Sequence, residues 1–521
     1  MPSAFRLTVK VGGPSFRFTV HSLPLNPPPN SPLAHAGAIE VARCLDGKRL
    51  QALDIMASQS IDFVKSFRTQ DVNFDGYLDF AVLAANIFGL IPETKRHPNS
   101  PILDKTMPKK THPPTHKKPT NPTVPGSPSG QPVFGQPIPS PDPSGFKNPV
   151  TDQSEQELET LQTVPQAAGN ATEPTLTLQQ VYGTAGSAKV QAIQKAGQIV
   201  FHSVGDTGSV VGPSTQSLVA DKMVTDFTET NPADIPSFFF HLGDVVYYFG
   251  EATYYYDQFY EPYRNYPVPI MAIPGNHDGV VAASGSAPTL AAFLANFCAA
   301  SPAPSPDAGG LSRTTMIQPG VYFTLEAPFV RILGLYSNVL EDPGVISDEN
   351  GANTMLDQRQ VAFLNAALTR VKSDRFAGAV IIAVHHPPFT GGSEHGGSPL
   401  MLQDIDNACK KTGVWPHAVL SGHAHNYQRY TRTVNKYQIP YIVAGCGGHS
   451  PLSSMRATLR TPYKIDNTLT LNSYDDTDYG YLRVIVNATT LRIEFHPQSD
   501  GGATKTPDDV VTVTLASHTV S

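Results

Sequence analysis

Five short apolar runs between residues 196 and 425 each end in a residue that can bind a metal ion. Runs of this length, bounded by Gly and Pro, are typical of buried strands. Ligands of open α/β sheets gather beyond the carboxyl ends of the strands, so five such ends in succession predict one shared site. The runs are Ala196–Val204, Ser237–Leu242, Pro269–Pro274, Ala379–Val384 and Ala418–Ser421.

Other segments carry the patterns of helices and of paired strands. Residues Leu178–Ala196 predict a helix ahead of the first strand, and Asp357–Val371 has apolar residues at helical spacing. Alternation in Tyr479–Phe495 predicts a hairpin, and Val510–Leu515 predicts a closing strand. Strands that alternate with helices and then pair with one another indicate an α/β fold.

The residues that follow the five runs form one set of metal-binding groups. The set holds no thiolate, whereas structural zinc usually takes four ligands, often Cys. Oxygen and nitrogen donors in this number suit two adjacent ions of the Fe, Mn or Zn kind, with one carboxylate as a bridge. Two ions about 3.5–4 Å apart form the clamp used for displacement at phosphorus. The members are Asp206, Asp244, Tyr247, Asn276, His385, His423 and His425.

The order of these blocks resembles the calcineurin-like metallophosphoesterases. That family carries Asp-x-His or Asp-x-Gly, Gly-Asp, Gly-Asn-His-Asp/Glu, His and Gly-His-x-His in succession, and all five blocks are present. Gly208 stands two residues after Asp206, where most of the superfamily has His, and Tyr247 stands three residues after Asp244. These two features resemble the purple acid phosphatases, in which a tyrosinate binds a ferric ion. Spacing favours Tyr247 over the adjacent Tyr248.

The resemblance implies a four-layer α/β/β/α sandwich, in which two mixed sheets pack together with helices on both outer faces. It also implies two metal ions, Fe(III) together with Fe(II), Zn or Mn. A tyrosine has an ordinary pKa near 10, so it loses its proton at neutral pH only beside a strongly acidic cation such as Fe(III). The first ion would take Asp206, Asp244, Tyr247 and His425. The second would take Asp244 as the bridge, with Asn276, His385 and His423.

Two further histidines receive catalytic roles from the same resemblance. His277 would meet the phosphate and protonate the leaving oxygen. His395, in the glycine-rich loop Phe389–Pro399, resembles a substrate-facing histidine of the family. His386 follows His385 directly, and adjacent strand residues point to opposite faces, so only one of the two can face the ions.

The other histidines of this region are not expected to be ligands. His202 and His241 lie inside apolar runs, and we expect them to support the ligands through hydrogen bonds or to be satisfied core residues. His449 follows a glycine-rich turn, and the sequence does not place it.

The chain divides by composition into three parts. Residues 98–149 hold fifteen prolines and few large apolar residues, so this segment cannot bury enough surface to order itself. We expect a small β-rich N-terminal module over residues 1–95 and a Pro-rich disordered linker over residues 96–174. The metallophosphoesterase domain is expected over residues 175–521.

The N-terminal module contains one motif with a chemical meaning. Oxygen ligands alternate along residues 71–79 with Gly76 at the turn, as in an EF-hand loop, but Val82 stands where the bidentate Glu belongs. The loop resembles a calcium repeat of the FG-GAP/VCBS type, although no second copy is found. An acidic turn that binds no ion is the alternative. The candidate calcium ligands are Asp71, Asn73, Asp75 and Asp79.

Charge and hydropathy exclude several partners. A net charge of −7 and a pI near 6.2 give no sign of nucleic-acid binding. No apolar run reaches about 18 residues, so no membrane span is expected, and Met1–Val20 lacks the apolar core of a signal peptide. We expect the cytoplasm for the chain as it reads, and another compartment if the native start lies upstream. The four cysteines leave one bridge open, between Cys298 and Cys409.

These features predict a dinuclear metallohydrolase that acts on small phosphate esters. Monoester hydrolysis of the acid-phosphatase type, by in-line attack of a metal-bound hydroxide, is the first interpretation because Tyr247 points to Fe(III). A phosphodiesterase is the alternative, because the same ions serve diesters. A non-catalytic protein that binds a surface or partner through its N-terminal module is the third interpretation. It would require a lost ligand, and all seven are present.

Overall fold

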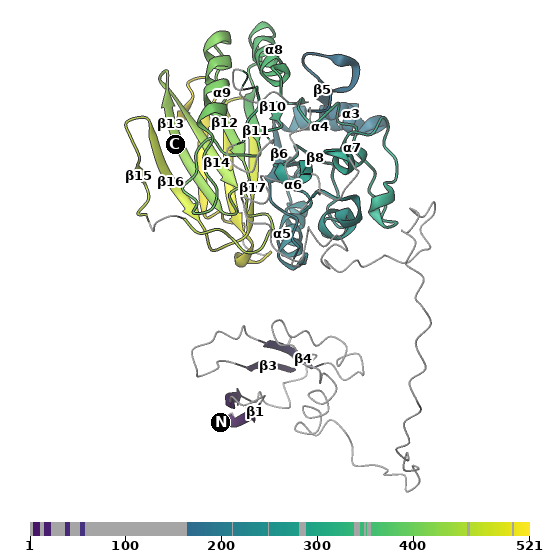
Figure 1. Cartoon of the computed structure of the whole chain (residues 1–521), viewed down its shortest axis with the longest axis vertical. Coiled ribbons are helices and arrows are strands. Elements are labelled where there is room, and N and C mark those ends of the chain that lie inside the picture. Colours follow the sequence, from purple (N-terminus) through teal and green to yellow (C-terminus); the bar gives the residue numbers. More distant parts are fainter. Residues whose placement is uncertain are drawn as a thin grey trace. The chain divides into compact units, whose positions relative to one another are not determined.

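The chain forms two compact units, Met1–His116 and Lys117–Ser521, and each is described by itself (Figure 1). In the computed structural model, the described part of the first unit is the backbone of four strands. They form an antiparallel sheet in the order β1-β2-β3-β4. These strands are β1 (Ala4–Lys10), β2 (Ser15–His21), β3 (Gly37–Val41) and β4 (Leu53–Ala57).

The second unit is described over residues 164–521, apart from residues 211, 248, 281–287, 338–343, 349–350, 352–355, 456–458 and 503–504. The candidate calcium ligands Asp71, Asn73, Asp75 and Asp79 lie outside the described residues, as does the predicted linker up to residue 163. The calcium site therefore stays a prediction.

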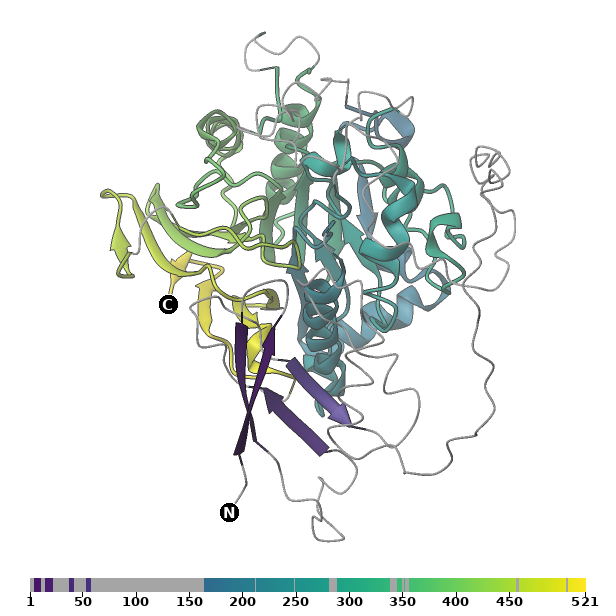
Figure 2. The same cartoon turned by 60° about the horizontal axis from the view of Figure 1, so that its bottom comes forward.

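Two sheets form the centre of the second unit (Figures 1 and 2). The first has nine strands in the order β15-β16-β13-β14-β12-β11-β10-β9-β5. They are β5 (Thr175–Thr177), β9 (Phe323–Ala327), β10 (Val330–Leu335), β11 (Ala379–Val384), β12 (Ala418–Ser421), β13 (Tyr427–Val434), β14 (Tyr437–Ala444), β15 (Tyr463–Lys464) and β16 (Leu469–Asp475).

The second sheet has seven strands in the order β20-β19-β18-β17-β6-β7-β8. They are β6 (Gln198–Val204), β7 (Phe239–His241), β8 (Ile270–Ala272), β17 (Gly480–Asn487), β18 (Thr490–Pro497), β19 (Asp509–Thr514) and β20 (Thr519–Val520). Strands β6, β7 and β8 run parallel to one another, as do β10, β11 and β12 in the other sheet. Each sheet therefore presents several carboxyl strand ends together.

Helices surround the two sheets. They are α3 (Leu178–Val181), α4 (Gly186–Ala196), α5 (Ser214–Thr225), α6 (Asn276–Gly279), α7 (Ala291–Phe297), α8 (Arg359–Ser373) and α9 (Pro399–Thr412). A single π-helical turn, Tyr256–Tyr260, follows β7.

The alternation of side chains along β11 shows how the layers form. Ala379, Ile381 and Ala383 belong to the core that also holds Phe201 of β6 and Val484 of β17, so this face lies between the sheets. The other three side chains, together with buried residues of α8 and α9, belong to the outer core. On the seven-stranded sheet, buried residues of α5 pack in the outer core with residues of β6 and β7. The predicted α/β/β/α sandwich is confirmed.

The predicted elements match the structure with one break and several omissions. The five apolar runs contain β6, β7, β8, β11 and β12, and the predicted hairpin and closing strand are β17–β18 and β19. The helix expected over residues 178–196 is interrupted. Gly183 has a positive φ of 55°, and a Cβ at Gly186 would lie 1.9 Å from the Gln179 carbonyl oxygen, so the chain turns here between α3 and α4. Among the strands that were not predicted is β14, which contains Pro440, a residue that is rare inside a sheet.

Packing against the sheets begins ahead of residue 175, where the sequence predicts the start of the domain. Val164 is buried in the outer core, and Ala167 is also buried. The Glu173 carboxylate accepts two hydrogen bonds of 2.7 Å from Arg370 and one of 2.9 Å from Thr324. Residues 164–174 are therefore part of the folded unit.

The described residues also bear on two expectations about the whole chain. Cys298, Cys409 and Cys446 are free, so the bridge between Cys298 and Cys409 is not formed. Within the described segments, no helix is long and apolar enough to cross a membrane.

The packing of residues 164–174 predicts the outcome of two truncations. We expect a fragment that starts at Thr151 to fold like the intact chain. A fragment that starts at Thr175 loses the buried Val164 and the Glu173–Arg370 pair, which should lower the free energy of unfolding by about 2–4 kcal/mol. Denaturant unfolding of both fragments measures the difference. Equal stability would contradict the contribution of this segment, and an insoluble Thr151 fragment would show that the fold requires preceding residues.

Candidate metal centre

The seven predicted ligands come together at one edge of the sandwich. Asp206 follows β6, Asp244 and Tyr247 follow β7, and Asn276 begins α6 just after β8. His385 follows β11, and His423 and His425 follow β12. All seven are at least nine-tenths buried. The strands of both sheets thus deliver their side chains to a common point.

Three of these residues have backbone conformations that residues other than glycine rarely adopt. The φ angles are 56° at Asp206, 54° at Asp244 and 68° at His423. Such left-handed conformations cost about 1–3 kcal/mol each and persist where surrounding structure enforces them, often at functional sites. Here the sharp turns point the ligand side chains back towards the strand ends.

One side of the centre is built around a carboxylate oxygen of Asp206. Asp206 Oδ1 lies 3.3 Å from the Tyr247 hydroxyl and 3.5 Å from His425 Nε2. The Tyr247 hydroxyl is also 3.3 Å from His425 Nε2. These three donors form a compact triangle of one carboxylate oxygen, one phenol oxygen and one imidazole nitrogen.

The other side is built around the amide oxygen of Asn276. Asn276 Oδ1 is 3.1 Å from both His385 Nε2 and His423 Nδ1. Ligand atoms of Asp244, His385 and His423 all lie within 4.8 Å of one another, and Asp244 Oδ2 is 3.3 Å from His385 Nε2. His385 Nε2 is in turn 3.9 Å from Asp206 Oδ1, so the two sides adjoin.

The donor set fits two metal ions. It contains hard oxygen and imidazole nitrogen donors without a thiolate, as first-row metals of the Fe, Mn or Zn kind require. The backbone also lies close to both carboxylates, since a Cβ at Gly275 would lie 2.0 Å from Asp244 Oδ1 and one at Gly422 would lie 2.4 Å from Asp206 Oδ2. Glycine at these two positions lets the carboxylates approach the backbone.

Burial and neighbouring charges set the proton affinities of the acidic groups. Burial raises the pKa of Asp206 to about 8, although His385 acts in the opposite direction. Burial has the same tendency at Asp244, but the positive charges of His385 and His277 outweigh it and hold the pKa of Asp244 well below its usual range. Against the effect of its own burial, the two carboxylates raise the pKa of His385 to about 9. The carboxylates thus favour positive charge in their midst.

Burial and neighbouring histidines lower the pKa of both His423 and His425 far below the usual value. These two imidazoles are therefore neutral, which is the form that binds metals.

Hydrogen bonds from outside the ligand set fix its geometry. His385 Nδ1 donates to the Leu242 carbonyl oxygen at 2.8 Å, which directs Nε2 towards Asn276 and Asp244. The Asp278 carboxylate accepts hydrogen bonds from the backbone N–H groups of Gly275 and Val245 at 2.9 and 3.1 Å. Asp278 therefore links the turns that carry Asp244 and Asn276. This role was not predicted, although Asp278 closes the Gly-Asn-His-Asp block.

Four histidines form the solvent side of the centre. His277, His395, His425 and His449 are 6–9% exposed, whereas the six predicted ligands other than His425 are at most 1% exposed. The His395 ring centroid is 4.2 Å from that of His423, so His395 lies beside the centre. His277 donates its backbone N–H to Asp244 Oδ1 at 3.0 Å, and its ring packs on Tyr247.

Glu394 also lies on this solvent side, which we call the mouth of the centre, and it was not predicted. It accepts a hydrogen bond from the Ser453 hydroxyl, and its carboxylate lies within 4.8 Å of ligand atoms of His395 and His425.

Three other histidines that lie in or next to the apolar runs have hydrogen-bond partners. His202 contacts Asp226 at 3.0 Å and Tyr266 at 2.9 Å, away from the seven ligands. His241 contacts Thr207 at 2.8 Å and accepts from the Gly243 N–H, so it supports two of the ligand-bearing turns. His386 Nδ1 is 2.9 Å from the Ser337 hydroxyl, and its ring packs on His423 at 4.1 Å. His385, the other member of the adjacent pair, contacts Asn276 Oδ1 at 3.1 Å and Asp244 Oδ2 at 3.3 Å.

The absence of a side chain at Gly208 leaves space that Tyr247 and Gln258 occupy. A Cβ at Gly208 would lie 2.4 Å from Gln258 Oε1 and 3.1 Å from Tyr247 Cδ2. Gln258 also exchanges two hydrogen bonds of 2.9 Å with the backbone of Tyr247. The space beside Gly208 is thus filled by Tyr247 and by the residue that holds it.

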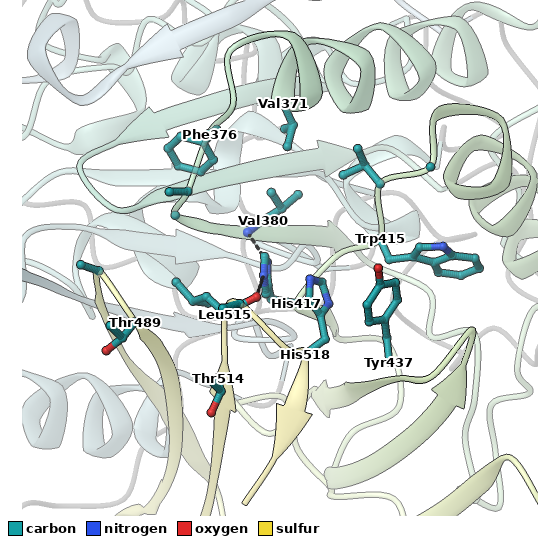
Figure 3. Close-up of a pocket in the computed structure, with 16 residues that line it drawn as sticks. Val371, Phe376, Val380, Trp415, His417, Tyr437, Thr489, Thr514, Leu515 and His518 are labelled. Atoms are coloured by element: carbon teal, nitrogen blue, oxygen red, sulfur yellow. Dashed lines mark hydrogen bonds between the residues drawn. The ribbon is translucent and has the colours of Figure 1, made fainter.

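A separate cavity of about 490 Å³ lies at the amino ends of β11 and β12, whereas the predicted ligands follow their carboxyl ends (Figure 3). Its lining includes Trp415, Tyr437, His417 and His518, and His417 is fixed there by hydrogen bonds with the Val380 N–H and the Leu515 carbonyl. None of the seven predicted ligands lines this cavity.

Comparison with known families agrees with the geometry. Residues 204–427 match the family of calcineurin-like phosphoesterases, and residues 439–504 match the family described as iron/zinc purple acid phosphatase-like protein C. The first match contains all seven predicted ligands. The chain therefore contains a calcineurin-like phosphoesterase domain, followed by a purple acid phosphatase-like C-terminal segment. It is a metal-dependent phosphoester hydrolase whose C-terminal strands are of the purple acid phosphatase-like kind, and its family implies two metal ions.

No curated protein matches the chain. Solved structures similar to it include GAP50, titled the anchor in the inner membrane complex of Plasmodium, with 13% identity over 61% of this chain and 89% of that chain and a TM-score of 0.42. PhoD shares 14% identity over 62% of this chain and 71% of that chain, with a TM-score of 0.37. The family matches, and not these distant structures, carry the assignment.

The geometry predicts different outcomes for two substitutions in the centre. Asp244→Asn should lose at least one ion and nearly all turnover, because it removes a negative charge that would hold two cations together. His386→Ala should keep both ions, because His386 contacts Ser337 and the His423 ring. Elemental analysis of the purified variants measures the ions per chain. Equal metal loss in His385→Ala and His386→Ala would contradict the placement of this pair.

Proposed function

We propose that the protein hydrolyses phosphate monoesters as an acid phosphatase of the purple type. Its centre would hold Fe(III) on the Tyr247 side and Fe(II), Zn or Mn on the Asn276 side. The observation that carries this proposal is the Tyr247 hydroxyl, which is fully buried and lies 3.3 Å from both Asp206 Oδ1 and His425 Nε2. A phenol in this position can serve as a metal ligand only as tyrosinate, for which Fe(III) is the suitable partner.

We divide the proposed ligands between the two ions according to the side of the centre on which each lies. Asp244 lies near His385 and receives the His277 N–H, so its carboxylate is proposed as the bridge between the ions. When bound, the two ions would polarise the phosphate and supply a nucleophile at mild pH. The remaining ligands are proposed as Asp206, Tyr247 and His425 for the first ion, and Asn276, His385 and His423 for the second.

His277 is proposed to donate a proton to the leaving oxygen. Its backbone is fixed by the hydrogen bond to Asp244, and its ring is packed against Tyr247 at a centroid distance of 4.2 Å. The side chain is slightly exposed at the mouth, where an ester oxygen would arrive. A general acid contributes typically 10²–10⁴-fold to such a step, by order of magnitude.

His395 is proposed to bind the phosphate group. Its loop is tied to the C-terminal part of the domain, since Ser393 N donates to the Ser454 carbonyl and the Gly391 N–H donates to Gln428 at 2.8 Å. These bonds hold His395 beside His423 and His425.

Removal of the phenol oxygen tests the iron assignment. A tyrosinate bound to Fe(III) absorbs visible light by charge transfer, so the isolated protein should be pink to violet and Tyr247→Phe should bleach it or shift its band. Tyr260→Phe is a matched control, because Tyr260 is equally buried but its hydroxyl bonds to Asn296 at 2.7 Å. A colourless, iron-free and fully active parent protein would rule out the tyrosinate.

The preference between monoesters and diesters is tested by direct assay. We expect kcat/KM for an aryl phosphate monoester to exceed that for the matching diester by at least about tenfold, a difference of about 1.4 kcal/mol in transition-state stabilisation. The reason is that a monoester presents an additional unesterified oxygen to the two ions and to His277 and His395. Assays of both substrates with the same leaving group provide the comparison. A preference for the diester would favour the phosphodiesterase alternative.

A further inference from the structure

His449 reaches the metal centre through a loop that none of the five motifs contains. It follows β14 after the turn Gly445–Gly448, and this turn is pressed against the turn that carries Asp206. Gly447 N–H donates to the Gly205 carbonyl at 3.1 Å, and His449 N–H donates to the Asp206 carbonyl at 2.8 Å. A Cβ at Gly448, where φ is 156°, would lie 2.6 Å from the Thr207 carbonyl oxygen. The backbones of the two turns are therefore joined.

The side chain of His449 is held in one orientation. Its Nδ1 is 3.1 Å from the Gly208 carbonyl oxygen. A carbonyl can only accept, so Nδ1 carries the proton in this hydrogen bond. Gly208 is the position where most of the superfamily has a histidine, so here the backbone of that position anchors a histidine from elsewhere in the chain.

The ring of His449 packs directly on Tyr247. The two ring centroids are 4.0 Å apart with an interplanar angle of 33°, and the His425 ring is 4.3 Å from His449 on the same loop cluster. Tyr247 also packs against His277 at 4.2 Å and 37°. Hydrogen bonds with Gln258 fix the backbone of Tyr247, and packing against the rings of His277 and His449 restricts the direction of its side chain.

We infer that His449 is a positioning residue that holds the Tyr247 ring so that its phenol oxygen faces Asp206 and His425. The Gly208 carbonyl orients the imidazole, and the imidazole orients the phenol. Gly208 thus contributes in two ways. The lack of a side chain leaves room for Tyr247, and the Gly208 carbonyl oxygen accepts the hydrogen bond that orients His449. This inference rests on the proposed function, in which Tyr247 binds Fe(III).

Three variants of the full chain test the inference. His449→Ala removes the ring, and His449→Phe keeps a ring but loses the hydrogen bond to Gly208. His518→Ala is the matched control, because His518 stacks on His417 at 4.0 Å and lines the remote cavity. The measurements are the visible absorption maximum per iron, the retention of iron against a chelator, and kcat and KM for an aryl phosphate.

We expect His449→Ala to move the absorption maximum and to weaken iron retention about ten- to a hundredfold, the usual effect of losing a residue that supports a ligand. His449→Phe should keep most of the band, and His518→Ala should match the parent. The KM should change little in all three, because the inference gives His449 no contact with substrate.

Several results would overturn the inference. A coloured parent with an unchanged band and iron content in His449→Ala would refute it while leaving the proposed function intact. A raised KM with an unchanged band would assign His449 to substrate binding instead. If His449→Ala fails to fold, a folded His449→Phe that loses the band would show that ring packing does not position Tyr247. A colourless parent would overturn the proposed function and this inference together.

Discussion

Two carboxylates buried side by side are the constraint on which the rest of the domain depends. Asp206 and Asp244 lie at strand ends of one sheet with at most 1% exposure, and charged groups so deep require compensating positive charge. The other sheet supplies His385, whose pKa the two carboxylates raise to about 9 even though burial acts against it. The sandwich therefore brings the carboxylates of one sheet against the imidazoles of the other, at a place where metal ions fit both.

The cost of this arrangement is local backbone strain. Asp206, Asp244 and His423 adopt positive φ angles. Beside two of them stand Gly243 and Gly422, where a Cβ would collide with a ligand side chain. Joined turns hold these conformations, since the loop that carries His449 bonds to the loop of Asp206, and Asp278 bridges the loops of Asp244 and Asn276. Rigid supports of this kind keep a reactive geometry in place before substrate arrives.

The sequence predicted the strands that end at the site because each is a short apolar run that stops at a Gly or Pro. Strand β14 was not predicted, and it contains Pro440, a residue that argues against an interior strand. The leading helix was predicted to run through Gly183 and Gly186, although contacts at Gly186 require a break. The ligands were found because their motifs are local. Asp278, Glu394 and His449 act through contacts between distant loops, and no spacing along the chain reveals such contacts. His395 was reached by resemblance alone.

The central claim is that Tyr247 binds iron beside Asp206 and His425. X-ray diffraction from crystals of the isolated protein, with anomalous data collected on both sides of the iron absorption edge, tests it most directly. The account predicts an iron peak within bonding distance, about 2 Å, of the Tyr247 oxygen, Asp206 and His425 Nε2. A second metal peak should lie about 3.5–4 Å away, next to Asn276. An iron-free centre, or a Tyr247 oxygen that contacts no metal, would contradict the account.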